Sequence, residues 1–209
     1  IRVGVGDNFG LSPDVTSTFN DLPAIQMLSM MGFTVDTFGN HSFDNSLNYL
    51  NKILEYAGFP FVATSLVNVP QNLDNTYKYA IVHVPSANND KNALPVAFIS
   101  ALDEEIQKSV FSGNFGTLDV GDFCSVAQTI EEAYNAGARA FFILGHLTAG
   151  SDSMFKVLNA IFSFADMSKE FEDENHCRNH LGFKETADET NASNDENEIN
   201  SSNHNVGNC

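Results

Sequence analysis

The segment Thr37-Phe38-Gly39-Asn40-His41-Ser42-Phe43-Asp44 places an amide, an imidazole and a carboxylate directly after an apolar run. This arrangement is typical of phosphate-ester chemistry on metal ions. The Asn40 amide oxygen is a neutral ligand that suits a hard or borderline divalent ion. The neighbouring His41 can protonate a leaving alkoxide if a carboxylate such as Asp44 orients it. The alternative interpretation is a Gly-Asn turn followed by Asp44 as the N-cap of a helix that begins at Asn45.

Two further segments end in residues of the kind that bind metals. Asp7 follows an expected N-terminal strand in the run Gly6-Asp7-Asn8-Phe9-Gly10-Leu11-Ser12-Pro13, and His146 ends a later apolar run. In open α/β sheets, sites form beyond the carboxyl ends of strands, so residues far apart in sequence can converge there. We therefore expect Asp7, Asn40 and His146 to surround a common point and to bind one cation.

The hydrophobic pattern predicts strands that alternate with helices. Apolar runs of strand length cover 1–5, 33–38, 59–65, 77–84, 94–101 and 139–144. Amphipathic helices are expected over 21–31, 45–56, 123–135 and 152–171. Strand, helix and strand in succession argue for an α/β fold, in which helices cover a parallel or mixed sheet.

At these residues the chain resembles the metallophosphoesterase domain of the 5'-nucleotidase, UDP-sugar hydrolase and cyclic-nucleotide phosphodiesterase group. Gly6-Asp7 with Ser12-Pro13 resembles the second block of that family. Residues 39–44 resemble the third block, with Ser42 where the family usually has an acidic residue, and Leu144-Gly145-His146-Leu147 resembles the fourth block. Weaker likenesses to a strand and a loop of the family occur at 58–68 and 112–116.

The resemblance implies a calcineurin-like fold, which is a four-layer αββα sandwich with mixed sheets. It also implies two divalent ions as cofactors, drawn from Zn, Mn, Mg or Ca. Asp7 would bridge the two ions, while Asn40 and His146 would complete three of the four protein ligands of the second ion. His41, oriented by Asp44, would stabilise the developing charge and protonate the leaving oxygen.

Two blocks of the family do not occur in this sequence: an Asp-x-His block before the second block, and a late Gly-His-x-His block. The chain is therefore expected to be incomplete at its N-terminus and to encode about half of a two-metal site. His176 and His180, one helical turn apart if helical, are a candidate replacement for the late histidines. The leading hypothesis is a metal-dependent hydrolase of phosphate esters, 5'-nucleotidase-like and acting on nucleotides. The alternatives are a catalytically degenerate domain kept as a binding or structural module, and a fragment of an intact enzyme.

Composition separates a compact domain over 1–170 from an acidic, Asn-rich tail over 171–209. Hydrophobic residues make up 43% of the 209 residues, which suffices for a sizeable core. The formal net charge of -17 argues against nucleic acid or an anionic membrane as partner, because both require Lys and Arg. A small phosphate ester is the expected partner, and no apolar run reaches the roughly 18 residues that span a bilayer.

The acidic character rises sharply near the C-terminus. From Asp166 onward, 11 acidic residues stand against Lys169, Arg178 and Lys184, and no aromatic residue follows Phe183. Such a segment buries too little apolar surface to offset the entropy of ordering it. We expect it to be disordered or extended, or to be ordered by a protein partner.

Cysteine content leaves the redox state open. Cys124, Cys177 and Cys209 lack the spacing of metal ligands and are compatible with one disulfide and one free thiol, or with no bridge. Secretion or a periplasmic location is therefore implied by the family resemblance alone.

Overall fold

The computed structural model describes residues 1–85, 93–111, 113–148 and 156–158. Its helices are α1 (Asp14–Ser17), α2 (Leu22–Met30), α3 (Leu47–Tyr56) and α4 (Cys124–Asn135), with 3₁₀ helices η1 (Asn40–Phe43) and η2 (Ile106–Ser109). Its strands are β1 (Asp36–Thr37), β2 (Phe61–Val62), β3 (Leu66–Val67), β4 (Thr76–Tyr77), β5 (Tyr79–Val84), β6 (Leu94–Leu102), β7 (Asp119–Val120) and β8 (Ala140–His146). The expected tail over 171–209, with His176 and His180, lies outside the described residues. The helix expected over 152–171 is described only at 156–158, which are helical.

Two three-stranded sheets form the centre of the domain, and both contain parallel pairs. The first has the order β1-β2-β4 and is parallel, and a parallel bridge from Val3 to Val35 extends it toward the N-terminus. The second has the order β5-β6-β8, with β6 antiparallel to β5 and parallel to β8. A small antiparallel pair of β3 and β7 completes the described strands. The expected mixed-sheet α/β fold is confirmed.

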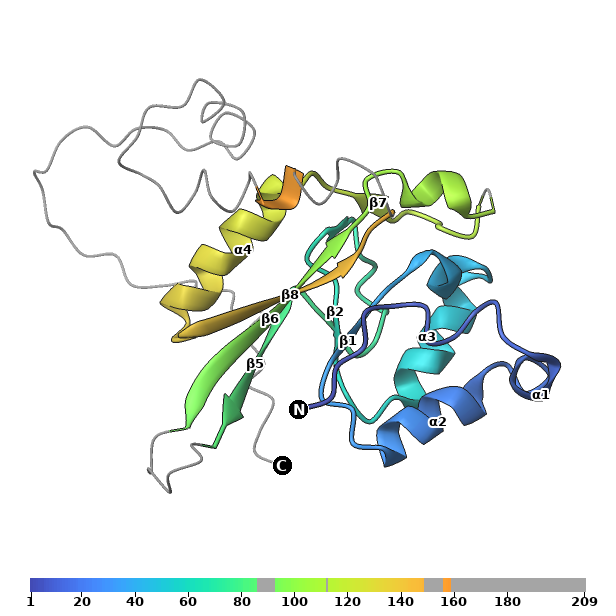
Figure 1. The fold of residues 1–209 in the computed structure, drawn as a ribbon. Helices are drawn as coiled ribbons and strands as arrows, with labels where there is room; N and C mark the ends of the chain where they lie inside the picture. The colour runs from blue at the N-terminus through green and yellow to red at the C-terminus, as the bar shows by residue number, and fades with distance from the viewer. Residues whose placement is uncertain (86–92, 112, 149–155, 159–209) are drawn as a thin grey trace, which may run out of the picture.

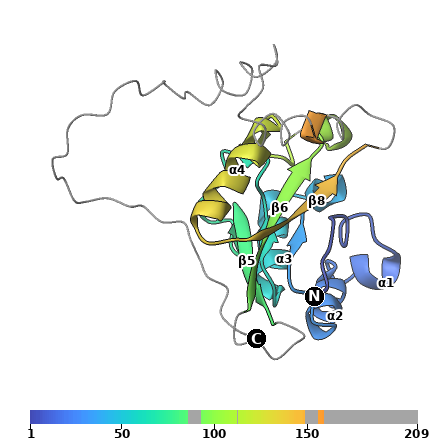
Figure 2. The same ribbon diagram turned by 60° about the vertical axis from the view of Figure 1, so that its left-hand side comes forward.

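Three apolar clusters show that the layers are stacked as helix, sheet, sheet and helix (Figures 1 and 2). One cluster joins α2 and α3 to the first sheet through Ile25, Leu50 and Phe61. A second lies between the two sheets and contains Val35, Val62, Phe98 and Leu144. A third joins the second sheet to α4 through Ile99 and Val126. Because side chains alternate along a strand, neighbours such as Phe61 and Val62 serve different clusters.

The start of α3 decides between the two interpretations of the segment 37–44. Ser46 is the N-cap, since its side chain accepts a hydrogen bond from the backbone N–H of Tyr49 at 3.3 Å. Asp44 instead follows η1 and turns its carboxylate toward His41. The alternative interpretation, with Asp44 as the N-cap, is wrong, and the helix begins two residues later than the predicted Asn45.

The observed bounds of two strands also differ from the expected ones. The strand expected over 33–38 is limited to Asp36–Thr37, and the strand expected over 1–5 forms only a single bridge at Val3. In the described part of the chain, none of the helices has the length and apolar character required to cross a bilayer. Cys124, at the start of α4, is disulfide-bonded.

Candidate metal centre

The three residues expected to surround one cation come from three chain segments that meet at one end of the sheets. Asp7 follows the segment whose Val3 forms a bridge with Val35, Asn40 opens η1 shortly after β1, and His146 is the last residue of β8. β1 and β8 lie against each other across the two sheets. The strand-end arrangement therefore brings together residues that are far apart in the sequence.

The ring of His146 is the centre of this group. Its Nε2 lies 3.2 Å from Asp7 Oδ2 and 3.2 Å from Asn40 Oδ1. Its Nδ1 lies 2.8 Å from the carbonyl oxygen of Val5. A carbonyl oxygen only accepts, so Nδ1 carries the hydrogen, and Nε2 of the neutral ring presents a lone pair to two oxygens.

The charges of this group are coupled. The hydrogen bond with Asp7 raises the pKa of His146, although burial acts in the opposite direction. Burial by itself would raise the pKa of Asp7, but the hydrogen bond and charge of His146 and the backbone N–H of His41 bring it below its ordinary value. The cluster therefore favours a positive charge between its oxygens, either on the imidazole or on a bound cation.

A hydrogen-bonded pair adjoins this group. His41 Nδ1 lies 2.7 Å from Asp44 Oδ2, and the backbone N–H of His41 donates to Asp7 Oδ1 at 2.9 Å. Asn114 Nδ2 donates to the carbonyl oxygen of Asp44 at 2.6 Å. Because Asp44 engages Nδ1, Nε2 of His41 is the ring nitrogen left to exchange a proton with a substrate.

Backbone packing at Gly39 leaves no room for a side chain inside the site. A Cβ at this position would lie 2.2 Å from Asp7 Oδ1 and 2.7 Å from His146 Cε1. The next turn is closed by Ser42, whose buried hydroxyl accepts a hydrogen bond from Gly39 N at 3.1 Å. Ser42 thus has a local structural role at the position where the resembling family carries an acid.

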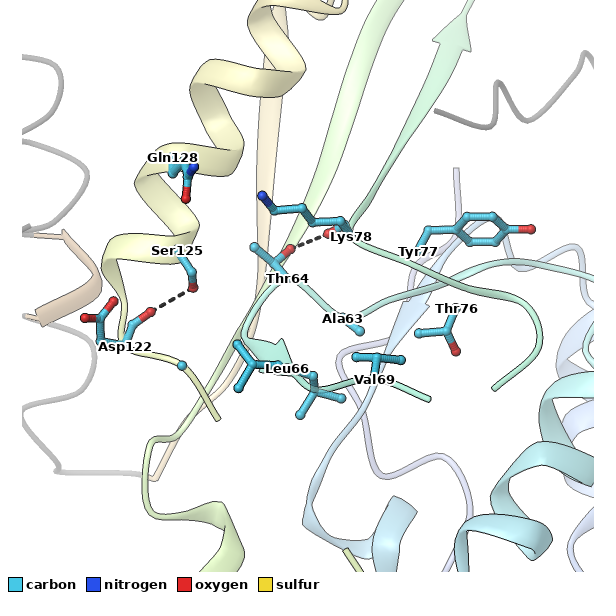
Figure 3. A pocket seen from close by; sticks show the side chains of 12 residues that line it. Ala63, Thr64, Leu66, Val69, Thr76, Tyr77, Lys78, Asp122, Ser125 and Gln128 are labelled. Carbon is cyan, nitrogen blue, oxygen red and sulfur yellow. Dashed lines mark hydrogen bonds between the residues drawn. The ribbon is translucent and has the colours of Figure 1, made fainter. Parts of the chain in front are cut away.

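Two hollows have different relations to this group. A cleft of about 370 Å³ is lined by Asn40 and His146 together with residues of η2 and the segment after β8. A larger hollow of about 710 Å³ lies between β4 and the start of α4, and Figure 3 shows Thr64, Lys78 and Gln128 on its wall. The larger hollow contains none of the five expected site residues. The smaller cleft is therefore the relevant one, because the chemistry rather than the size identifies the site.

Comparison with known proteins gives one consistent fold. A cell wall protein of Listeria monocytogenes is 30% identical over 165 residues, which cover 71% of this chain and 21% of that protein. A 2',3'-cyclic-nucleotide 2'-phosphodiesterase/3'-nucleotidase of Haemophilus influenzae is 28% identical over 150 residues, 69% of this chain and 23% of that protein. The crystal structure of the calcineurin-like phosphoesterase YfkN from Bacillus subtilis matches with a TM-score of 0.56 at 23% identity, covering 69% of this chain and 47% of that one.

The chain has the calcineurin-like phosphoesterase fold. The predicted resemblance to the nucleotidase and cyclic-nucleotide phosphodiesterase group is confirmed by these relatives. No protein-family model matches the chain. The chain spans less than a quarter of the length of the two sequence relatives.

The donor set of this group fits a divalent cation. Two ligand atoms about 2.1 Å from one metal ion and at right angles to each other lie about 3 Å apart, close to the 3.2 Å separations around His146 Nε2. Among the described residues, however, no three His, Cys, Asp or Glu side chains form a group able to hold a metal. The candidate set has two of these residue types, Asp7 and His146, and the amide of Asn40.

Two acidic residues near the candidate site were not expected from the sequence. Asp103 follows β6, accepts the backbone N–H of Thr148 at 3.0 Å, and donates its own N–H to the carbonyl oxygen of His146. The strand-end argument that selected Asp7 would have selected Asp103 as well. Asp36 lies inside β1 and is fully buried. A lone carboxylate inside the expected strand over 33–38, just before the Asn40 turn, was the signal available for it.

Proposed function

We propose that this chain carries part of the active site of a metal-dependent hydrolase of phosphate esters, with nucleotide-type esters as substrates. The observation that carries the proposal is the convergence of Asp7, Asn40 and His146 beside the hydrogen-bonded pair of His41 and Asp44. The phosphodiesterase/3'-nucleotidase of Haemophilus influenzae supports the substrate class.

Asp7, Asn40 and His146 would hold one divalent ion, and Asp7 would share a second ion with ligands that the described residues do not supply. When bound, such ions supply Lewis-acid polarisation of a phosphoryl oxygen and neutralise the charge of the phosphate. This charge is needed because a chain with a net charge of -17 repels a phosphate ester. The mixed oxygen and nitrogen donor set suits a hard or borderline divalent ion, and Zn, Mn, Mg and Ca are the candidates.

The chain's own residues move the proton. His41 would hold a proton on Nε2 and deliver it to the leaving oxygen as the ester bond breaks. Asp44 fixes the ring through Nδ1 and stabilises the charged imidazolium. The backbone N–H of His41 and the ring of His146 contact the two oxygens of the Asp7 carboxylate and fix its position. In this mechanism the pair of His41 and Asp44 provides general acid catalysis, and the other three residues provide binding.

The test is phosphate release from AMP and from p-nitrophenyl phosphate with added Mn²⁺ or Zn²⁺. We expect activity in the wild type and its loss in His41→Ala and in Asp7→Ala. A matched control is Ser100→Ala, which removes the buried hydroxyl that accepts the backbone N–H of Thr64 at 2.8 Å and that contacts none of the five expected site residues. Activity that survives both site substitutions would contradict the proposal.

A second candidate is a degenerate phosphoesterase domain that acts as a binding module. It is favoured by the lack of a group of three His, Cys, Asp or Glu side chains among the described residues. Elemental analysis of the folded protein distinguishes the two. A protein without bound metal that takes up none from Mn²⁺ or Zn²⁺ solutions and hydrolyses neither ester is the outcome expected for the binding module.

We also propose a location outside the cytoplasm. The relative in Listeria monocytogenes is a cell wall protein, and Cys124 is disulfide-bonded. Disulfides persist mainly in oxidising compartments such as the cell surface and the periplasm. Detection of the protein in an extracellular or envelope fraction tests this, and recovery only with cytosolic markers would contradict it.

A further inference from the structure

The turn that presents Asp7 has an unfavourable backbone conformation. Gly6 has a φ of 87° and Asp7 a φ of 56°, so both lie in the left-handed region. Glycine adopts this region freely, but an L-residue such as Asp pays for it in free energy. A turn of this kind persists only where the surrounding structure holds it in place. The residues that hold it therefore control where the Asp7 carboxylate points.

Asp36 forms hydrogen bonds with the residues on both sides of Asp7. Its Oδ1 accepts the backbone N–H of Gly6 at 3.2 Å, and its Oδ2 accepts the side-chain Nδ2 of Asn8 at 2.7 Å. Its Oδ1 also accepts the N–H of Thr37 at 2.8 Å, which fixes the carboxylate relative to its own strand. The carboxylate is thus a bridge from β1 to the residues immediately before and after Asp7.

The packing around this bridge is tight. Asp36 has 0% exposure, and a Cβ on Gly4 would lie 2.0 Å from Asp36 Oδ1. The N-terminal segment therefore passes directly over the carboxylate, and only a glycine allows this approach. Burial of a carboxylate is costly unless its oxygens are hydrogen-bonded. An apolar residue would serve better at this position of β1 if packing were its only role, since Val35 directly before it and Phe38 two residues after it are fully buried.

We propose that Asp36 is a positioning residue that directs the Asp7 carboxylate toward His146 Nε2 and Asn40 Oδ1, and thereby sets the cation affinity of the site. The proposal rests on the proposed function for its cation. Asp36 itself touches neither the cation position nor the substrate. Its effect is transmitted through Gly6 and Asn8, whose positions fix the orientation of the residue between them.

A second buried carboxylate, that of Asp21, also forms hydrogen bonds with this loop, but at a different position. It is 1% exposed and accepts the N–H of Gly10 at 3.0 Å and the hydroxyl of Tyr49 at 2.7 Å. Gly10 is three residues beyond Asp7, so Asp21 holds the far end of the loop and not the Asp7 turn itself. Asp21→Asn is consequently a useful comparison, because it perturbs a buried carboxylate of the same loop.

The test measures Mn²⁺ affinity by calorimetry in the full chain. Residues that support metal ligands typically change affinity about 10- to 100-fold when replaced, and we expect a weakening of this size in Asp36→Asn. We expect a smaller change in Asp21→Asn and none in Ser100→Ala, which loses a buried hydrogen bond elsewhere. In the double variant Asp36→Asn with Asn8→Asp, donor and acceptor are exchanged, and affinity should recover by about tenfold or more.

A second readout does not need the metal. Amide hydrogen exchange in the metal-free protein should become faster at Gly6 and Asp7 in Asp36→Asn and return toward the wild-type rate in the double variant. Unchanged exchange, or equal weakening of Mn²⁺ binding in Asp36→Asn and Ser100→Ala, would overturn the positioning role. If the wild type binds no Mn²⁺, the proposed function fails. Faster amide exchange in Asp36→Asn would still show that Asp36 holds the turn at Gly6 and Asp7 in place.

Discussion

His146 Nε2 lies 3.2 Å from Asp7 Oδ2, which joins the end of β8 to the turn that follows the N-terminal segment. The opposite nitrogen of the ring is held by the Val5 carbonyl oxygen at 2.8 Å, so the ring is fixed to the N-terminal segment at both of its nitrogens. This contact connects the second sheet, through β8, to the N-terminal segment beside the first sheet. It also makes the stability of the metal-free protein sensitive to pH.

The sign of the pH effect follows from the two shifts. The pKa of His146 is raised above 6.5, so its contribution to the unfolding free energy is complete below 6.5 and is lost as pH rises through the folded-state pKa. The pKa of Asp7 is lowered below 3.8, so its contribution is complete above 3.8 and is lost as pH falls through the folded-state pKa. The pair therefore stabilises the metal-free fold most between pH 3.8 and 6.5.

Urea denaturation in the presence of EDTA measures this contribution. We expect the difference in unfolding free energy between the wild type and His146→Gln to be largest in that window and to shrink on either side of it. Glutamine keeps polar atoms in the site but does not titrate. A difference that stays constant from acid to alkaline pH would show that the ion pair contributes nothing to stability.

The role of His41 predicts a dependence on the leaving group. His41→Ala should lower kcat for AMP by about 10²- to 10⁴-fold, because an alkoxide leaves poorly without a proton. The loss on p-nitrophenyl phosphate should be much smaller, since its phenolate leaves unprotonated. Steady-state kinetics on both esters gives the comparison. Equal losses on the two esters would assign His41 to phosphate binding rather than to proton transfer.

The convergence of three of the expected residues could be predicted because each is a polar residue at the end of an apolar run. Asp7, Asn40 and His146 follow this rule in three separate segments, and the tertiary fold then brings them together. The residues that support them do not follow from this rule. Asp36 lies within a strand, and its partners Gly6 and Asn8 belong to a turn whose left-handed backbone has no strong signal in a single sequence.

Strand lengths show the same limit. The apolar pattern over 33–38 is a correct signal of burial, since Val35 and Phe38 are fully buried. The pattern does not show that the chain leaves the sheet after Thr37, passes close to Asp7 and His146 at Gly39, and then forms η1. Close contact between backbone segments decides that point, and such contact depends on residues elsewhere in the sequence.

Metal binding should stabilise the fold in a way that depends on Asp7. At a Mn²⁺ concentration of about 100 times Kd, mass action adds about 2.7 kcal/mol to the unfolding free energy. Asp7→Asn should abolish this gain because it removes the anionic ligand. Asparagine tolerates the left-handed backbone at least as well as Asp, so the variant should remain folded. Thermal unfolding with and without Mn²⁺ provides the measurement, and an equal rise in Tm for both proteins would place the bound ion elsewhere.

The contact from Asn114 should affect the orientation of the His41 pair. Asn114→Ala removes the hydrogen bond to the Asp44 carbonyl oxygen, which should cost about 1 kcal/mol of stability and lower kcat for AMP several-fold. Gln107→Ala is the matched control, because Gln107 Nε2 donates to Asp119 Oδ1 at 2.8 Å and not to the Asp44 carbonyl oxygen. We expect Gln107→Ala to retain wild-type kcat. Parallel losses in both variants would point to general loosening of this segment.

Gly39 provides the sharpest test of the site's geometry. Its φ is -122°, an extended value open to any residue, so Gly39→Ala introduces a steric effect without backbone strain. The new Cβ would meet Asp7 Oδ1 at 2.2 Å and His146 Cε1 at 2.7 Å, and both groups must move apart to admit it. Since the two donors would then no longer face a common point, Mn²⁺ affinity should fall about tenfold or more.

Gly145→Ala is the matched control for Gly39→Ala. It adds the same methyl group directly before His146 in β8, but the nearest atom to its Cβ would be Leu147 Cδ1 at 3.5 Å, an ordinary contact. Calorimetric titration with Mn²⁺ and urea denaturation of both variants separate binding from folding. We expect Gly145→Ala to bind as the wild type does. Wild-type affinity in Gly39→Ala would mean that the close approach of Asp7 and His146 is not required to hold the cation, because the methyl group cannot be accommodated while that approach persists.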